Sequence, residues 1–162
     1  MIKWDGKYSA FTVKEKGIVR RLMTRAKISG PNHFQEVTAQ WDTGASFTAI
    51  ARELVKSLDL KPIGFTTVLS PTGSKELRKF YVDIELPSGV TVRSVEVAES
   101  DIGAQGIGVL IGMDIIAQGS FSISNYEGKT TFSFIVPPAS PLDYVQKINA
   151  QNQIKQSGKK RR

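Results

Sequence analysis

The amino-acid sequence predicts an all-β protein, mainly β with one or two short helices. Polar and apolar residues alternate over 81–86 and again over 90–98, which is the period of strands with one buried face. Turn residues separate such stretches at short intervals, as at Pro71 and Gly73 and again over 87–89. Several short strands at this spacing are typical of a β-barrel or a β-sandwich.

The first part of the chain is expected to supply strands. Residues 8–13 are a candidate strand, and residues 34–40 alternate between polar and apolar. The apolar positions of 18–29 also fit a helix, but glycines bracket the run on both sides and favour one or two strands. The turn 30–33 would then join this run to 34–40 as a hairpin.

One stretch, 48–58, has the period of an amphipathic helix. The apolar residues that share its inner face are Ile50, Leu54, Val55 and Leu58. Ser46 or Thr48 is expected to cap its first turn, and Pro62 is expected to end it.

From residue 65 onward the pattern is β again. Strands are expected at 65–70, 75–86, 90–98, 109–111, 121–124 and 130–136, with a loop over 99–108. The run 109–111 is wholly apolar, as expected for a strand buried on both faces. Gly112 is expected to begin a brief helix over 113–117.

The composition suits a single domain without a membrane segment. The chain has 162 residues, of which 40% are hydrophobic and 23% charged. No run approaches the roughly 20 apolar residues that span a bilayer, and the first residues lack the apolar core of a signal peptide. There are no cysteines, which excludes disulfides and thiolate metal sites and fits a cytoplasmic location. The single histidine, His33, lies in a polar turn and is expected to be exposed, so we expect no metal or other cofactor.

The net charge of +7 is concentrated at the C-terminus. Residues 147–162 hold six basic residues and no acidic one, which leaves 16 basic and 15 acidic residues for the rest. Leu142, Val145 and Ile148 recur every three residues and predict a short helix over 142–153. The polar segment from Lys155 onward is expected to be a solvated, disordered tail. Its charge leaves open a weak acidic or nucleic-acid partner.

The segment 40–46, Gln-Trp-Asp-Thr-Gly-Ala-Ser, is the strongest functional signal. It places Asp42 where a predicted strand breaks into a tight turn, followed by Thr43 and by Gly44. Glycine takes backbone angles that a side chain forbids and lets another backbone approach closely. Asp-Thr-Gly alone is also the composition of an ordinary turn, so the surrounding sequence carries the functional interpretation.

The segment resembles the active-site motif of the retropepsins, the retroviral type of aspartic protease, which reads Asp-Thr/Ser-Gly-Ala. The family has a second signature, two apolar residues and a glycine, which Leu110, Ile111 and Gly112 match. Between the two signatures it has a β-hairpin flap, for which 68–75 is suitably placed. The resemblance implies a closed barrel with one lobe per chain. It divides the sequence into an N-terminal extension (1–17), a protease domain (18–138) and a tail (139–162).

The family's chemistry needs two carboxylates that share one proton. This sequence has a single Asp-Thr/Ser-Gly, since Asp101 in Asp-Ile-Gly lacks the hydroxyl residue and the preceding strand. The second carboxylate must then come from another copy of the chain. The direct inference is a two-fold homodimer with one Asp42 from each subunit, which would act on a polypeptide substrate.

Roles follow from the resemblance. Asp42 would be the catalytic acid or base, and Thr43 would hydrogen-bond across the two-fold axis. The remaining assignments are an active-site loop that continues through Gly44, Ala45 and Ser46, a flap formed by Ser70, Pro71, Thr72, Gly73 and Ser74, and loop support from Leu110, Ile111 and Gly112. Two positions depart from the viral pattern: Met113-Asp114 replaces an arginine after the glycine, and Trp41 is bulkier than the usual aliphatic residue. Trp41 is expected to pack in the core.

Two other functions stay open from the sequence. One is a non-catalytic peptide-binding or dimerisation module of the same fold. The other is a nucleic-acid-associated protein that acts through the basic tail, although the tail has no aromatic residue after Tyr144.

Overall fold

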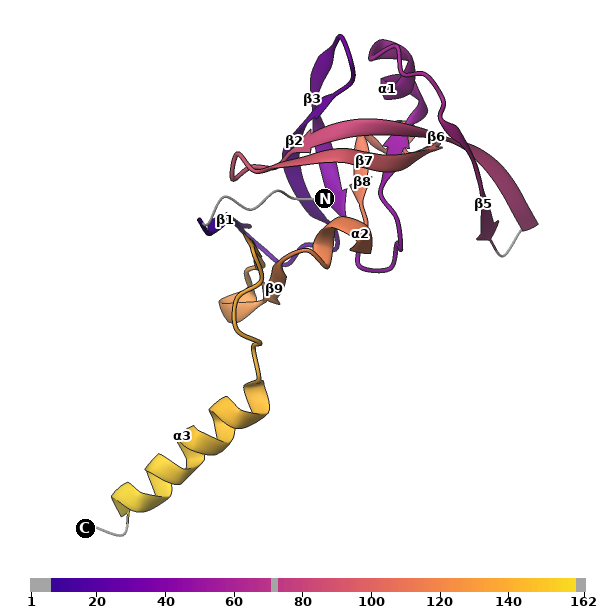
Figure 1. The fold of residues 1–162 in the computed structure, drawn as a ribbon. Helices are drawn as coiled ribbons and strands as arrows, with labels where there is room; N and C mark the ends of the chain where they lie inside the picture. Colours follow the sequence, from indigo (N-terminus) through magenta and orange to yellow (C-terminus); the bar gives the residue numbers. More distant parts are fainter. Residues whose placement is uncertain (1–6, 71–72, 160–162) are drawn as a thin grey trace.

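Ten strands are the main secondary structure of the described residues, and they pair into two sheets (Figure 1). The computed structural model describes residues 7–70 and 73–159. Its strands are β1 (Ser9–Lys14), β2 (Leu22–Ser29), β3 (Phe34–Trp41), β4 (Ala49–Ala51), β5 (Gly64–Ser70), β6 (Gly73–Glu85), β7 (Thr91–Ser100), β8 (Val109–Ile111), β9 (Ser120–Ser124) and β10 (Thr131–Val136). Its helices are α1 (Arg52–Ser57), α2 (Met113–Ile116) and α3 (Tyr144–Lys159), with short 3₁₀ turns η1 (Gly103–Gln105) and η2 (Tyr126–Gly128). The prediction of a mainly β fold is confirmed.

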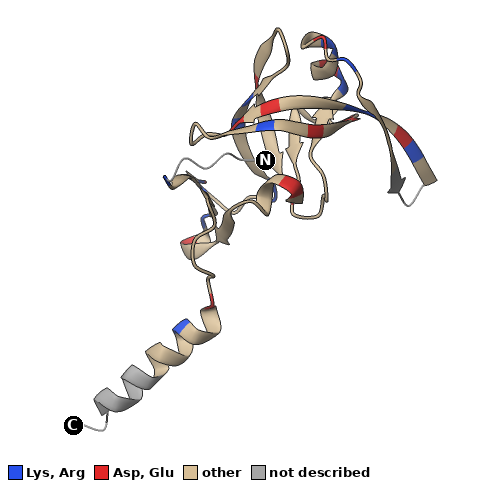
Figure 2. Cartoon of the chain, viewed as in Figure 1, with Lys and Arg blue, Asp and Glu red and all other residues tan. Residues whose placement is uncertain are grey.

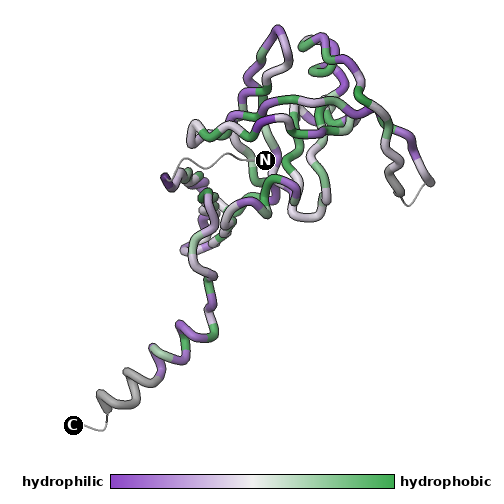
Figure 3. Tube along the Cα trace, in the orientation of Figure 1, coloured by the Kyte–Doolittle hydropathy of each residue, from purple (hydrophilic) through white to green (hydrophobic). Residues whose placement is uncertain are grey.

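The larger sheet has the strand order β2-β3-β8-β4-β7-β6-β5. A further pairing sets Lys27 of β2 opposite Glu85 of β6, so the sheet curls round and meets itself. Hydrophobic and hydrophilic residues are interleaved along these strands, as expected when one face is buried (Figure 3). The fully buried side chains inside include Ile28, Ile50, Phe80, Ile84, Val97, Val109 and Ile111.

The smaller sheet has the antiparallel order β1-β10-β9. Phe134 of β10 lies opposite Phe11 of β1 on one side and opposite Phe121 of β9 on the other. The hairpin expected from 121–124 and 130–136 is confirmed. β1 lies in the segment that we expected to be an N-terminal extension, and its pairing makes it part of the folded sheet.

The hairpin predicted for the first part of the chain is formed by β2 and β3, which pair in register from Leu22 opposite Trp41 to Ser29 opposite Phe34. The Gly30 amide closes the turn by donating to the His33 carbonyl over 2.8 Å. His33 is exposed, as predicted. The strand is shorter than expected because residues 18–21 precede it without strand structure.

The helix predicted for 48–58 is wrong in its first part. Residues Ala49–Ala51 form β4, which pairs with β7 on one side and β8 on the other, and α1 begins only at Arg52. These pairings satisfy the backbone groups of β4 and bury Ile50 completely, which outweighs a weak local helix preference. The helix cap is wrong as well, because Ala51 precedes α1 and no side chain caps it.

β5 and β6 form a long hairpin that projects beyond the rest of the larger sheet (Figure 1). β6 pairs with β7 from Lys79 to Glu85. Residues 73–78 pair with β5 alone, as far as the described residues show. We call β5 together with 73–78 the arm. Pro71 and Thr72, at its tip, lie outside the described residues.

α3 extends away from both sheets (Figure 1), and its residues 144–152 are exposed. Asp143 caps it, since its carboxylate accepts from the amides of Val145 (2.9 Å) and Gln146 (3.1 Å). The helix that we expected over 142–153 is present and continues to Lys159, so it includes part of the segment expected to be disordered. None of the helices in the described residues is both long and apolar enough to cross a bilayer.

Candidate active site

Asp42 directly follows β3, where the strand turns away from the larger sheet. Its amide donates to the Ile111 carbonyl of β8 over 3.0 Å, so the parallel pairing of β3 with β8 continues through it. Its side-chain Oδ1 accepts from the Gly44 amide over 2.8 Å, and its carbonyl accepts from the Ala45 amide over 3.3 Å. Backbone groups therefore hold a half-buried carboxylate at the end of a strand. We call residues 42–48 the Asp42 turn.

Position 44 favours glycine because the Asp42 carboxylate lies close to its Cα. Gly44 does not have the positive φ that the sequence led us to expect. A Cβ atom there would instead lie 3.2 Å from Oδ1 of Asp42, against the hydrogen bond that orients the carboxylate. A side chain at 44 would therefore press on the acidic group itself.

The second sequence motif lies directly against the Asp42 turn. Ile111 accepts the Asp42 amide, and the Met113 amide donates to the Ala45 carbonyl over 2.8 Å. Gly112 is buried, and a Cβ there would come within 2.6 Å of the Phe47 carbonyl carbon. Only glycine fits this contact without moving the turn. The structure thus brings together the two motifs that the sequence singled out.

Thr48 and Asp114 complete the support of the turn, although neither was a predicted site residue. Oδ2 of Asp114 accepts from the Thr48 amide (3.0 Å), and Oδ1 accepts from the Thr48 hydroxyl (2.7 Å). The hydroxyl oxygen in turn accepts from the Gly112 amide over 3.1 Å. Thr48 is fully buried, so these bonds satisfy groups that water cannot reach. The sequence offers one signal for Asp114: Met113 and Asp114 follow Gly112, where the viral pattern has an arginine.

Trp41 precedes the Asp42 turn and is buried among the aromatic rings of the smaller sheet. Its indole stacks on Phe121 at 5.7 Å between ring centroids, and Phe134 and Phe11 lie at 5.0 and 5.5 Å. The indole N–H donates to the Thr24 hydroxyl over 2.9 Å. The prediction that Trp41 packs in the core is confirmed. The residue before Asp42 is therefore fixed by both sheets.

The other predicted site residues lie in two places. Thr43 and Ser46 are exposed and Ala45 is half-buried, all in the Asp42 turn, whereas Leu110 pairs with Gln40 in β8 and β3. The expected flap is at the tip of the arm, where Ser70 pairs with Gly73 and Ser74 with Leu69. Gly73 has a φ of 125°, which favours glycine. Pro71 and Thr72 of the predicted flap fall outside the described residues.

Charges of both signs lie along β6 and β7 (Figure 2), and one carboxylate among them is buried. The Arg78 guanidinium donates to Glu99 through two bonds of 2.9 and 2.6 Å. These bonds hold the pKa of Glu99 below its ordinary value and raise the pKa of Arg78. Lys75 likewise lowers the pKa of Asp101, with a further contribution from Arg52. Lys75, Arg78, Glu99 and Asp101 are far in sequence from the Asp42 turn. Neither of the two sequence motifs includes them.

Two surface hollows lie away from Asp42. One, of about 370 Å³, is lined by residues of β3, α1 and 103–108, and the other, of about 380 Å³, by residues of β2 and 85–89. No group of His, Cys, Asp and Glu side chains within the described ranges is arranged to hold a metal ion.

Comparison with known proteins gives one family match. The model of the family described as aspartyl protease matches residues 24–115, more than half of the chain. This range includes the Asp42 turn, the arm and Leu110 to Gly112. The comparison with curated proteins gave no match.

Several solved structures match this chain at low sequence identity. A retropepsin-like aspartic protease from Rickettsia conorii is 16% identical with a TM-score of 0.49, and the match covers 83% of this chain and 98% of that one. The simian foamy virus protease is 22% identical (TM-score 0.46; 59% and 92% covered). The protease of EIAV, solved in complex with the inhibitor HBY-793, is 19% identical (TM-score 0.49; 60% and 86% covered).

Proposed function

Because the chain belongs to the aspartyl protease family, we propose that it is an aspartic endopeptidase that works as a homodimer. One observation carries the proposal most directly. Asp42 lies within the matched region, and its carboxylate is held by the backbone of its own turn. A carboxylate fixed in this way is ready to act on a substrate without reorganising first.

The reaction would be the hydrolysis of a peptide bond by a water molecule. Two Asp42 carboxylates about 3 Å apart cannot both ionise cheaply, so they would share one proton. The ionised carboxylate takes a proton from the water, whose oxygen attacks the scissile carbonyl carbon. The protonated carboxylate donates to the carbonyl oxygen. Collapse of the tetrahedral intermediate breaks the C–N bond, and the leaving amine takes up a proton.

The homodimer follows from the number of motifs. Asp-Thr-Gly occurs once in 162 residues, so each subunit would supply one carboxylate of the pair. Thr43, which is exposed beside Asp42, would bond across the two-fold axis. Ala45 and Ser46 would border the substrate, and the Gly44 carbonyl would accept from the substrate backbone. The tip of the arm, 70–74, would close over the substrate as a flap.

The test is cleavage of an unfolded protein or a peptide library by purified protein. We expect Asp42→Asn to abolish cleavage while circular dichroism and the melting temperature stay close to wild type. Asparagine has nearly the same shape and still accepts the Gly44 amide, but it cannot act as the base.

Asp59→Asn is the matched control, since Asp59 is exposed, pairs with Lys61, and lies outside the Asp42 turn. It should cleave like wild type. Cleavage by Asp42→Asn at the wild-type rate would refute the proposal. Failure of wild type to cleave any peptide would favour the non-catalytic alternative.

A further inference from the structure

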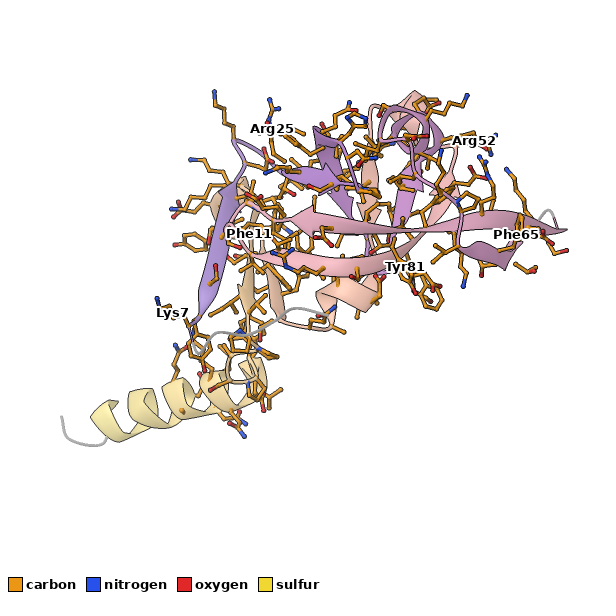
Figure 4. The ribbon with its side chains drawn as sticks, turned by 45° about the horizontal axis from the view of Figure 1, so that its top comes forward. Lys7, Phe11, Arg25, Arg52, Phe65 and Tyr81 are labelled. Carbon is orange, nitrogen blue, oxygen red and sulfur yellow. The ribbon has the colours of Figure 1, made fainter. Side chains whose placement is uncertain are left out.

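The described side chains of the arm, which ends in the expected flap, form no hydrophobic core of their own. Of its residues with described side chains, 64–67 and 73–78, none is buried. Phe65 is 62% exposed, and Figure 4 shows it on the projecting part of the hairpin. Hydrogen bonds between β5 and β6 hold the two strands to each other. They do not fix the angle between the arm and the barrel.

Two ion pairs connect the arm to the barrel. Arg78 forms the bidentate pair with Glu99, near the end of β7. Lys75, which lies closer to the tip on the same strand, pairs with Asp101 over 3.1 Å. A planar guanidinium that meets both oxygens of a carboxylate restricts direction as well as distance. The two pairs together therefore restrain rotation of the arm about its root.

The acidic ends of these pairs are themselves held in place. Glu99 is 7% exposed, and its side chain is the one buried carboxylate of the described residues. Arg52, at the start of α1, lies 3.2 Å from Asp101 and 3.9 Å from Glu99. Figure 4 shows Arg52 on the side of the molecule where the arm begins. α1 directly follows β4, and β4 pairs with β8, the strand that supports the Asp42 turn. Arg52 therefore connects the two acidic residues to the part of the larger sheet that carries the candidate site.

We propose that Glu99 and Asp101 are positioning residues that set, through Arg78 and Lys75, the angle at which the arm stands over a bound peptide. The inference rests on the proposed function, because it gives the arm a substrate to cover. The ion pairs hold the arm in one direction before substrate arrives. Breaking them leaves the arm to sample many directions, and the substrate must then order it on binding. The loss falls on substrate binding, with little effect on the chemical step.

The sharpest test compares two lysines on the same strand. Lys75→Gln removes the pair with Asp101 inside the arm, whereas Lys79→Gln removes a pair with Glu96 (2.8 Å) where β6 already lies against β7. We expect Lys75→Gln to raise KM for a peptide about threefold and to leave kcat within about twofold. Lys79→Gln should leave both constants unchanged.

The double variant Arg78→Gln/Glu99→Gln removes the second pair without leaving a buried charge unpartnered. Combined with Lys75→Gln, it should raise KM about tenfold or more. Amide hydrogen exchange of 64–70 and 73–78 should be faster than in wild type, while exchange in the barrel strands stays the same.

Unchanged exchange in the arm of the combined variant would overturn the inference, as would an equal rise in KM for Lys79→Gln. The exchange measurement does not need catalysis. If wild type cleaves no peptide, the proposed function fails, and exchange in the arm still decides whether the ion pairs position it.

Discussion

At the residue scale, the Asp42 turn depends on Thr48 and Asp114, which neither motif contains. Three hydrogen bonds join the two residues to each other and to Gly112. They tie α2 to the far end of the turn, while Ile111 ties β8 to its start. The turn is therefore fixed at both ends, which is what a catalytic carboxylate needs to keep its direction.

Replacing Asp114 with alanine should destabilise the protein by about 3 kcal/mol, because the buried amide and hydroxyl of Thr48 lose their acceptors. Asp114→Asn should cost less, since its amide oxygen can still accept from Thr48 and its NH₂ can donate to the hydroxyl. Urea denaturation followed by circular dichroism measures both. Equal stability of the alanine variant and wild type would show that the bonds do not support the turn.

The Glu99 carboxylate makes a prediction about pH. Arg78, followed by Arg52, holds the pKa of Glu99 below its unfolded value of about 4.5. Because the pKa of Glu99 is lower in the folded protein than in the unfolded chain, its ionised carboxylate stabilises the fold. This stabilisation is fully present above the unfolded pKa and is lost as the pH falls through the folded pKa. Wild type should therefore lose more unfolding free energy between about pH 6 and about pH 3 than Glu99→Gln does. Parallel curves for the two proteins would contradict the assignment.

At the element scale, alternation predicts most strands, and the elements it misses depend on partners distant in sequence. The short strand Val109–Ile111 is found as predicted, because a wholly apolar run of this length fits a strand buried on both faces. The pattern of β4 favours a helix because Ile50, Leu54, Val55 and Leu58 share a helical face. Its two neighbouring strands, which no local pattern reveals, decide its conformation.

The arm carries a prediction at its tip. Gly73 has a φ of 125°, and a Cβ atom added there would lie more than 4 Å from every described residue other than its chain neighbours. A side chain at position 73 would therefore strain the backbone, but it would not clash with a neighbouring side chain. Gly73→Val should lower turnover several-fold while the melting temperature stays nearly unchanged, because the arm is not packed in the core.

Gly17→Val is the matched control, since Gly17 also has open space around it but no positive φ. It should retain wild-type turnover. A fall in melting temperature for Gly73→Val that matches its loss of activity would mean that Gly73 belongs to a rigid structural turn.

We expect α3, in contrast to the arm, to be dispensable for activity. Its described side chains up to residue 152 are exposed, and Asp143 caps its start. A chain that ends at Gln153 should cleave peptides with wild-type kcat and KM. Sedimentation at equal concentration should give the same oligomeric state. Loss of activity or of the dimer on truncation would place α3 in the subunit interface.

At the scale of the whole molecule, the fold class and the central residues of the candidate site could be predicted from the sequence. Asp42 and Gly44 could be found because an acid and a glycine follow a predicted strand, and Gly112 could be found because it matches the second signature of the family. Thr48, Asp114 and Glu99 could not, because each acts through a partner that only the folded chain brings near. Hydrogen bonds between distant polar residues leave no periodic signal in a sequence.

The central claim is that each active site takes one Asp42 from each of two copies. The most direct measurement adds increasing amounts of Asp42→Asn to a fixed amount of wild type, after incubation long enough for subunits to exchange. Mixed dimers hold one carboxylate and should be inactive. At equal amounts of the two proteins, activity should therefore fall to about half, and it should continue to fall as more variant is added. An equal amount of an unrelated protein should have no effect. Activity that stays constant as Asp42→Asn is added would contradict the shared site.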